Sequence, residues 1–244
     1  MKMFTGLMPT AMKQWYWRKL EDRRLMREFH TNDLKYAREL SYWDARWQAE
    51  GRRLGNEHYE RIFLAMAGEK DQTFCTDKIV ADFGCGPRGS LCWATKARAR
   101  IGIDVLADQY CRRLGAAGHN MVYVCSSETT VPLPSNYVNV LFTLNALDHT
   151  YEFSRICNEL IRILAPGGDL IGSFNLDEPP TPCEPQTLTL ERVENHLLRH
   201  LCIITQRIAP RGPADDVYRF MNDPVSGENN SSTPRVLWVR ARKA

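Results

Sequence analysis

A short apolar run followed at once by a glycine-rich turn is the feature that most constrains this chain. Residues 79–83, Ile-Val-Ala-Asp-Phe, are followed by Gly84, Gly86 and Gly89. Continuous apolar runs bounded by turn residues are typical of strands buried on both faces. Four further runs of this kind follow, at residues 100–104, 121–124, 138–144 and 169–174.

Helical patterns separate these predicted strands. The clearest covers residues 151–164, and the turn at 165–168, Ala-Pro-Gly-Gly, ends it. Strands that alternate with helices predict an α/β fold with a parallel sheet covered on both faces. The apolar residues of the clearest helix share one face: Phe153, Ile156, Cys157, Leu160, Ile163 and Leu164.

The pattern changes after about residue 175. Residues 177–187 are rich in proline and acidic residues, and residues 189–200 look helical. Two last strands are predicted at 201–207 and 235–242, joined by a loop over about 210–234. Two strands linked in this way indicate that the sheet ends in an antiparallel pair.

Length and composition exclude several classes of protein. A chain of 244 residues suits one large domain, with or without an appendage, and residues 1 to about 70 read as helical. The net charge of +3 does not indicate a polyanion-binding protein. No stretch approaches the roughly 20 apolar residues of a membrane span, and no apolar export signal is apparent. We therefore expect a cytoplasmic protein with no membrane partner.

The cysteines point to the same compartment. There are eight, without a CxxC pair, in a chain with no export signal. We expect reduced thiols rather than disulfides. A zinc site would need more closely spaced ligand pairs, so no metal site is predicted.

The glycine turn allows two interpretations. Gly84, Gly86 and Gly89 satisfy the GxGxxG pattern, and Asp104 ends the next predicted strand, where its carboxylate could accept hydrogen bonds from a ribose diol. A nicotinamide dinucleotide and S-adenosylmethionine fit this pattern equally well. Asp82 favours the second, because a carboxylate two residues before the first glycine repels a pyrophosphate but suits an ammonium and a sulfonium group. The alternative is that Asp82 only holds amides of the loop.

At these residues the chain resembles the class I S-adenosylmethionine-dependent methyltransferases. Residues 82–86 resemble their first motif, and Asp104 resembles their ribose-binding acid. Many members carry Asp where Ser126 stands in this chain. The other similar segments are 126–128 with 131–134, which resemble the loop around adenine, 144–149, which resembles the fourth motif, and 164–170, which resembles the turn before the fifth strand.

The resemblance implies a Rossmann-like, doubly wound, mostly parallel seven-stranded sheet with an antiparallel last strand, formed by residues 71–244. It also implies S-adenosylmethionine as cofactor and S-adenosylhomocysteine as product. The residues expected to bind the cofactor are Asp82, Gly84, Cys85, Gly86, Asp104, Val105, Ser126, Ser127, Glu128 and Asn145.

The N-terminal residues 1–70 are expected to form a helical lid or substrate cap. Residues 42–47, Tyr-Trp-Asp-Ala-Arg-Trp, resemble the aromatic lid of several small-molecule members. The resemblance implies that Arg46 and Trp47 contact the methionine end of the cofactor and that Tyr42 faces the substrate. Alternatively, this helix only packs its tryptophans on the sheet, because a spacing of four residues is ordinary core patterning.

His149 is the candidate general base, because it follows the fourth strand and its ordinary pKa lies near neutrality. Asp148 could orient it. Alternatively, the two residues cap the helix that begins near Tyr151. The acceptor is expected to contact Asn175 and Glu178 as well, in a proline-rich acidic loop that could hold a cationic or polyhydroxylated molecule such as an amino sugar. The alternative is a solvated acidic loop.

The predicted function is methyl transfer to an oxygen or nitrogen atom of a small-molecule acceptor. A second hypothesis is a methyltransferase acting on RNA or protein, because residues 13–19 and three arginines nearby interleave aromatic and basic side chains. Glu21, Asp22 and Glu28 interrupt that segment, so nucleic acid is not the expected partner. A third is a non-catalytic cofactor-binding partner. The oligomeric state stays open.

Overall fold

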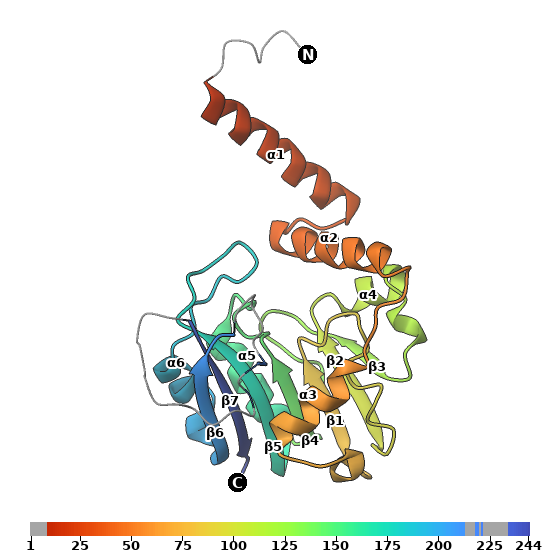
Figure 1. Cartoon of the computed structure of the whole chain (residues 1–244), viewed down its shortest axis with the longest axis vertical. Helices are drawn as coiled ribbons and strands as arrows, with labels where there is room; N and C mark the ends of the chain where they lie inside the picture. The colour runs from red at the N-terminus through yellow and green to blue at the C-terminus, as the bar shows by residue number, and fades with distance from the viewer. Residues whose placement is uncertain (1–8, 213–217, 220, 222–233) are drawn as a thin grey trace.

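The computed structural model describes residues 9–212, 218–219, 221 and 234–244. Its centre is a seven-stranded sheet of order β3-β2-β1-β4-β5-β7-β6 (Figure 1). β1 to β5 pair in parallel, and β7 is antiparallel to both of its neighbours. The predicted fold is therefore confirmed. The strands are β1 (Ile79–Phe83), β2 (Ala99–Asp104), β3 (Val122–Cys125), β4 (Val138–Leu144), β5 (Leu164–Leu176), β6 (Cys202–Pro210) and β7 (Arg235–Arg242).

The strands begin and end close to the predicted bounds, with one exception. β5 begins at Leu164, whereas the sequence predicts a turn at 165–168 and a strand from 169. Leu164 pairs with Val138, and the register then shifts before Val140 pairs with Asp169. The glycines and proline thus form an irregularity within a paired strand. Most of the predicted loop over 210–234 lies outside the described residues.

Helices cover both faces of the sheet. They are α1 (Thr10–Glu28), α2 (Leu34–Ala49), α3 (His58–Ala67), α4 (Ala107–Arg113), α5 (Phe153–Ile163) and α6 (Leu190–His196), with short 3-10 helices at η1 (Gln72–Cys75), η2 (Ala116–Gly118) and η3 (Leu198–His200). On one face α5 buries Phe153, Ile156, Cys157, Leu160 and Ile163, as its periodicity predicts. On the other face Phe63 of α3 stacks on Phe142 of β4, with ring centroids 4.3 Å apart. Burying each such side chain stabilises the fold by about 1.5–3 kcal/mol.

The three N-terminal helices cover different parts of the molecule. α1 leans away from the sheet, and α2 crosses above the strand ends (Figure 1). Asp33 is the N-cap of α2, and its side chain accepts a hydrogen bond from the amide of Lys35 at 2.8 Å. α3 packs in the core against the sheet. Within the segment predicted as a lid, α2 is thus the part that lies over the strand ends. The division of the chain into two parts at residue 70 stays a prediction.

Two further sequence expectations concern the whole chain. All eight cysteines lie among the described residues and are free thiols. Among the helices of the described ranges, none has the length and apolar character needed to cross a membrane.

Candidate active site

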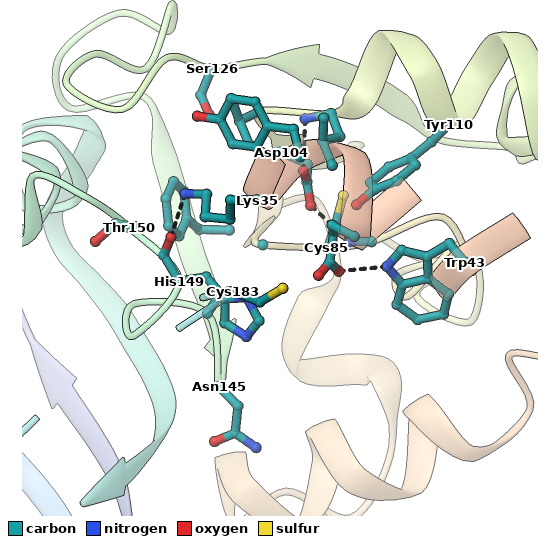
Figure 2. Close-up of a pocket in the computed structure, with 18 of the residues that line it drawn as sticks. Lys35, Trp43, Cys85, Asp104, Tyr110, Ser126, Asn145, His149, Thr150 and Cys183 are labelled. Carbon is teal, nitrogen blue, oxygen red and sulfur yellow. Dashed lines mark hydrogen bonds between the residues drawn. The ribbon is translucent and has the colours of Figure 1, made fainter. Parts of the chain in front are cut away.

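A cavity of about 510 Å³ lies between α2 and the carboxyl ends of the parallel strands. Side chains from both sides converge on it, with Trp43 from α2 facing Cys85 from the β1 turn (Figure 2). Most of the predicted site residues therefore come together. Those that line the cavity are Tyr42, Gly84, Cys85, Gly86, Asp104, Val105, Ser126, Ser127, Glu128, Asn145 and His149.

The glycine turn is packed against its neighbours, and at Gly84 too closely to carry a side chain. Gly84 has φ +74°, and a Cβ on it would lie 2.1 Å from the Cβ of Ala146 in the turn after β4. Gly86 has φ +57°, and a Cβ there would lie 3.3 Å from the indole of Trp43. Both glycines adopt a left-handed backbone that other residues rarely take. The turn therefore presents its backbone to the cavity.

Asp104 joins the end of β2 to this turn. Its Oδ2 accepts a hydrogen bond from the amide of Gly86 at 3.1 Å, and its Oδ1 accepts one from the amide of Leu106 at 2.9 Å. Burial raises the pKa of Asp104 to about 6, against the opposing effect of these two amides. Each carboxylate oxygen has two lone pairs, so both can still accept a hydrogen bond from the cavity.

Asp82 lies beneath the turn and does not line the cavity. It is buried, and its Oδ2 accepts a hydrogen bond from the hydroxyl of Ser90 at 2.5 Å. Its Oδ1 has no hydrogen-bond partner among the described residues. Burial raises the pKa of Asp82 to about 7, although the Ser90 hydroxyl opposes the shift. Asp82 is thus held by a hydroxyl and keeps one oxygen free.

The loop of residues 126–130 makes contacts that the sequence did not indicate. Ser127 Oγ accepts hydrogen bonds from the amides of Thr129 and Thr130, at 3.2 and 2.9 Å, and so closes a turn. Glu128 accepts hydrogen bonds from the Lys35 ammonium at 2.7 Å and from the Tyr36 hydroxyl. Glu128 therefore attaches α2 to the sheet.

Lys35 is the central residue of this attachment, and sequence reasoning missed it. Its ammonium also donates to the carbonyl of His149 at 2.7 Å (Figure 2) and lies 3.9 Å from the ring centroid of Tyr151. The side chain is only 6% exposed. A lysine in the first turn of a helix is usually a surface residue, so nothing in the local sequence marks it.

The face of α2 that lines the cavity lies about one helical turn before the residues that the sequence predicts. Tyr36, Glu39 and Trp43 line the cavity, and the Trp43 indole donates to Glu39 Oε1 at 2.8 Å. Their spacing is that of one helical face, so periodicity could have found them. Arg46 and Trp47 do not line the cavity. Arg46 is exposed and donates to the Tyr42 hydroxyl, and Trp47 packs in the cluster around α4.

The other predicted substrate residues are also placed outside the cavity lining. Asn175 is buried in β5, and its Oδ1 has no hydrogen-bond partner within the described ranges. Glu178 forms an ion pair with Arg211. Their contact with an acceptor stays a prediction.

The turn after β4 holds His149 and Asp148 beside a residue from the next loop. His149 Nε2 lies 3.7 Å from Glu184 Oε1 and 4.0 Å from Asp148 Oδ1, so Asp148 is not hydrogen-bonded to it. Burial raises the pKa of Asp148, with a further contribution from Glu184 and an opposing one from His149. Neither residue caps α5, whose N-cap is Glu152. The sequence missed Glu184 because it lies 35 positions after His149.

Asn145 stands at the same strand end. It has φ +46°, and its Oδ1 accepts a hydrogen bond from the Ser173 hydroxyl of β5 at 3.1 Å. Its backbone amide donates to the carbonyl of Ser173 at 2.9 Å. β5 therefore holds Asn145, which lines the cavity, in this left-handed backbone conformation.

Comparison with known proteins gives one domain match and a shared fold. The family model of a methyltransferase domain matches residues 81–172. No curated protein gives a significant sequence match. The S-adenosylmethionine-dependent methyltransferase from Mesorhizobium loti aligns at 18% identity and a TM-score of 0.53, over 73% of this chain and 96% of that chain.

Two other solved structures have the same fold. One is in the complex between the Haloferax volcanii Trm112 methyltransferase activator and the putative methyltransferase, at 14% identity and a TM-score of 0.59, over 84% of this chain and 96% of that chain. The other is geranyl diphosphate C-methyltransferase from Streptomyces coelicolor A3(2), in complex with Mg²⁺, geranyl diphosphate and S-adenosylhomocysteine. It aligns at 16% identity and a TM-score of 0.50, over 69% of this chain and 71% of that chain.

The family match shows a methyltransferase domain over residues 81–172, and the sheet order is that of solved S-adenosylmethionine-dependent methyltransferases. The methyl acceptor is a separate question, because likeness at these identities establishes the fold alone.

Proposed function

We propose that this enzyme transfers the methyl group of S-adenosylmethionine to an oxygen or nitrogen atom of a small-molecule acceptor and releases S-adenosylhomocysteine. The observation that carries the proposal is the position of α2 over the cavity. α2 lies over the strand ends, and the Lys35–Glu128 ion pair, 2.7 Å long and largely buried, attaches it there. An acceptor must therefore fit beneath a helix rather than lie on an open face.

The residues present fit the cofactor. Gly84 and Gly86 line the cavity without side chains of their own, so a ligand can approach their backbone. Asp104 retains lone pairs that can accept from a ribose diol. Asp82 has a buried oxygen without a partner in the described residues, next to the turn, and a charged Asp82 favours a cationic ligand. We propose that these residues, with Ser126 and Asn145 at the neighbouring strand ends, bind the cofactor.

The chemistry requires alignment more than acid–base catalysis. When bound, the cofactor supplies a methyl group on a sulfonium, whose sulfur leaves as a neutral thioether. A lone pair of the acceptor forms the new bond to the methyl carbon as the carbon–sulfur bond breaks, and an acceptor O–H or N–H proton passes to a base or to water. The protein's task is to orient the acceptor and to exclude water.

We propose that His149 and Asp148 act on the acceptor, and that Tyr42 contacts it. His149 and Tyr42 both line the cavity, and the imidazole of His149 is 36% exposed, so it can be reached from the cavity. Asp148 lies behind it and is largely buried. The contacts expected of Arg46, Trp47, Asn175 and Glu178 stay predictions.

The RNA or protein alternative rests on α1. Trp15 and Trp17 are 61% and 57% exposed, and α1 leans away from the cavity (Figure 1). Residues two apart on a helix point in different directions, so these two rings do not form one stacking surface. The small-molecule acceptor is therefore the better supported proposal.

The cofactor part is tested by calorimetric titration. We expect S-adenosylmethionine and S-adenosylhomocysteine to bind, and NAD not to bind. Asp104→Asn should weaken the affinity about 10-fold or more, the usual loss for a hydrogen bond to a charged group. Asp108→Asn is the matched control, because its side chain is 64% exposed on α4. Equal affinities for Asp104→Asn and the wild type would refute the assignment.

The acceptor part is tested by transfer of a labelled methyl group. The purified chain is incubated with labelled S-adenosylmethionine and either a metabolite extract or total RNA and protein. Label in small molecules supports the proposal. Label in RNA or protein alone supports the alternative.

A further inference from the structure

Three side chains that can bind a cation lie close together, His149 and Glu184, which line the cavity, and the buried Asp148 next to them. One donor atom from each lies within 4.8 Å of the other two, and His149 Nε2 is 3.7 Å from Glu184 Oε1. Two donors at about 2.1 Å from one ion stand about 3 Å apart when adjacent and about 4.2 Å apart when opposite. The three side chains therefore have nearly the spacing that a single ion requires.

Asp148 provides an independent observation. It is 5% exposed, and its Oδ1 has no hydrogen-bond partner in the part of the chain that the structure describes. A buried carboxylate oxygen without a partner is unfavourable, and such groups usually have a protein, water or ion partner. This oxygen lies 4.0 Å from His149 Nε2, within the cluster. Of its charged neighbours, His149 offsets the negative charge of Asp148, whereas Glu184 and Glu178 add to it.

Hydrogen bonds hold Glu184 and its loop in place. The Thr181 hydroxyl donates to Glu184 Oε2 at 3.1 Å, which leaves Oε1 directed at the imidazole. The loop that carries Glu184 is tied to the turn after β4, because the amide of Gln186 donates to the carbonyl of Asp148 at 3.2 Å. The Gln186 side-chain amide also donates to the carbonyl of Tyr151 at 3.0 Å. The cluster is thus assembled from two loops that support each other.

We propose that Asp148, His149 and Glu184 form a binding site for one divalent cation. Two carboxylates and one imidazole suit a transition-metal ion such as Mn²⁺, since the imidazole favours such ions over Ca²⁺ or Mg²⁺. Three protein ligands leave coordination positions open to the cavity, which His149 and Glu184 line.

The role of this ion toward the acceptor rests on the proposed function. An ion at this place would bind an oxygen atom of the acceptor. It would lower the pKa of the acceptor's hydroxyl group, so that the hydroxyl proton passes to water. His149 would then act as a ligand through Nε2 and not as the general base. The acceptors favoured are molecules whose reacting atom is an oxygen or is next to one.

The test is a titration of the chelator-treated full chain with Mn²⁺. The concentration of free Mn²⁺ at each step is measured by its electron paramagnetic resonance signal. We expect one Mn²⁺ per chain. Glu184→Gln and Asp148→Asn should each weaken binding at least about 10-fold. Glu194→Gln, an exposed residue of α6, is the matched control and should bind Mn²⁺ like the wild type.

A chelator-treated chain that does not take up Mn²⁺, or a Glu184→Gln variant that binds it like the wild type, overturns the proposal. If Asp148→Asn fails to fold, Glu184→Gln still decides, because its side chain is 35% exposed in a loop. S-adenosylmethionine affinity is measured on the same preparations. Retained cofactor binding without Mn²⁺ binding rejects the cation site alone, and loss of cofactor binding rejects the proposed function.

Discussion

At the scale of single residues, the candidate site depends on two buried carboxylates and on the two glycines that line the cavity, Gly84 and Gly86. Asp82 and Asp104 are held by one hydroxyl and two amides, and burial raises the pKa of both. Neither is paired with a cation in the structure. Both are therefore more costly to ionise than exposed carboxylates, and a positively charged ligand would relieve that cost.

Asp82 should make the stability of the ligand-free protein depend on pH. Its pKa of about 7 in the folded state lies above the ordinary value of 3.8, so the folded form binds the proton more tightly than the unfolded form. This contribution to stability is complete below about pH 4 and is lost as the pH rises to about 7. Asp82→Asn mimics the protonated form, so the variant should lose less stability than the wild type between pH 5 and pH 8.

The melting temperatures of the wild type and Asp82→Asn at pH 5 and pH 8 measure this difference in stability. In a chain of this size, each kcal/mol shifts the melting temperature by about 2–4 °C. Asp108→Asn, on the exposed face of α4, should follow the wild type. Parallel curves for wild type and Asp82→Asn would contradict the assignment.

The close packing of the glycine turn predicts unequal effects of two alanine substitutions. Gly84 and Gly68 have similar φ values, +74° and +68°, but only at Gly84 does an added Cβ collide with another residue. Gly68→Ala should cost about 1–2 kcal/mol, the price of a left-handed backbone. Gly84→Ala should cost more, about 3 kcal/mol or above, because overpacking adds to it.

Urea unfolding measures both costs. The collision is with the Cβ of Ala146, so Ala146→Gly combined with Gly84→Ala should recover part of the loss. Equal costs at the two glycines, or strict additivity in the double variant, would disprove the packing explanation.

At the scale of elements, α2 connects the N-terminal segment to the site. Its first turn supplies Lys35 and Tyr36 to Glu128, and its middle supplies Glu39 and Trp43 to the cavity. A helix of 16 residues is about 24 Å long, so its last turn passes beyond the cavity. This explains why Arg46 does not reach the cavity.

Lys35→Met should detach α2. The substitution keeps the length of the side chain but leaves the Glu128 carboxylate without its ammonium partner. Breaking a largely buried ion pair costs about 2–3 kcal/mol when one partner keeps some contact with water. Arg112→Met is the control, because its pair with Asp108 is 69% and 64% exposed and such pairs contribute about 0–1 kcal/mol.

The free energy of unfolding in urea gives the cost, and limited proteolysis shows where the chain opens. We expect cleavage between residues 29 and 57 to become faster in Lys35→Met. A cost no larger than that of Arg112→Met would show that the ion pair does not hold α2.

At the scale of the whole molecule, the sheet order brings distant segments to one edge. β1 lies between β2 and β4, so the turns after these three strands form a common surface beneath α2. α1 lies apart from this arrangement (Figure 1), and Asp22, paired with Arg38 at 2.9 Å, is its one buried residue.

Removal of the first 20 residues should therefore leave the enzyme domain intact. A chain that starts at Glu21 keeps Asp22 and the residues that pack against α4. We expect its melting temperature to stay within about 2 °C of the full chain and its affinity for S-adenosylmethionine to be unchanged. Loss of cofactor binding would instead assign α1 to the cofactor site.

The sequence alone determined the elements and the cofactor edge of the site. Apolar runs, helical periodicity and the glycine turn depend on residues close together in the chain, so the strands, α5 and the positions of Gly84 and Asp104 could be predicted. Only the tertiary structure decided how distant segments meet. Lys35 binds Glu128 across 93 positions, Glu184 joins His149 from a later loop, and Arg46 is outside the cavity lining. These outcomes depend on loop paths and on where a helix crosses the sheet, and no local pattern records them.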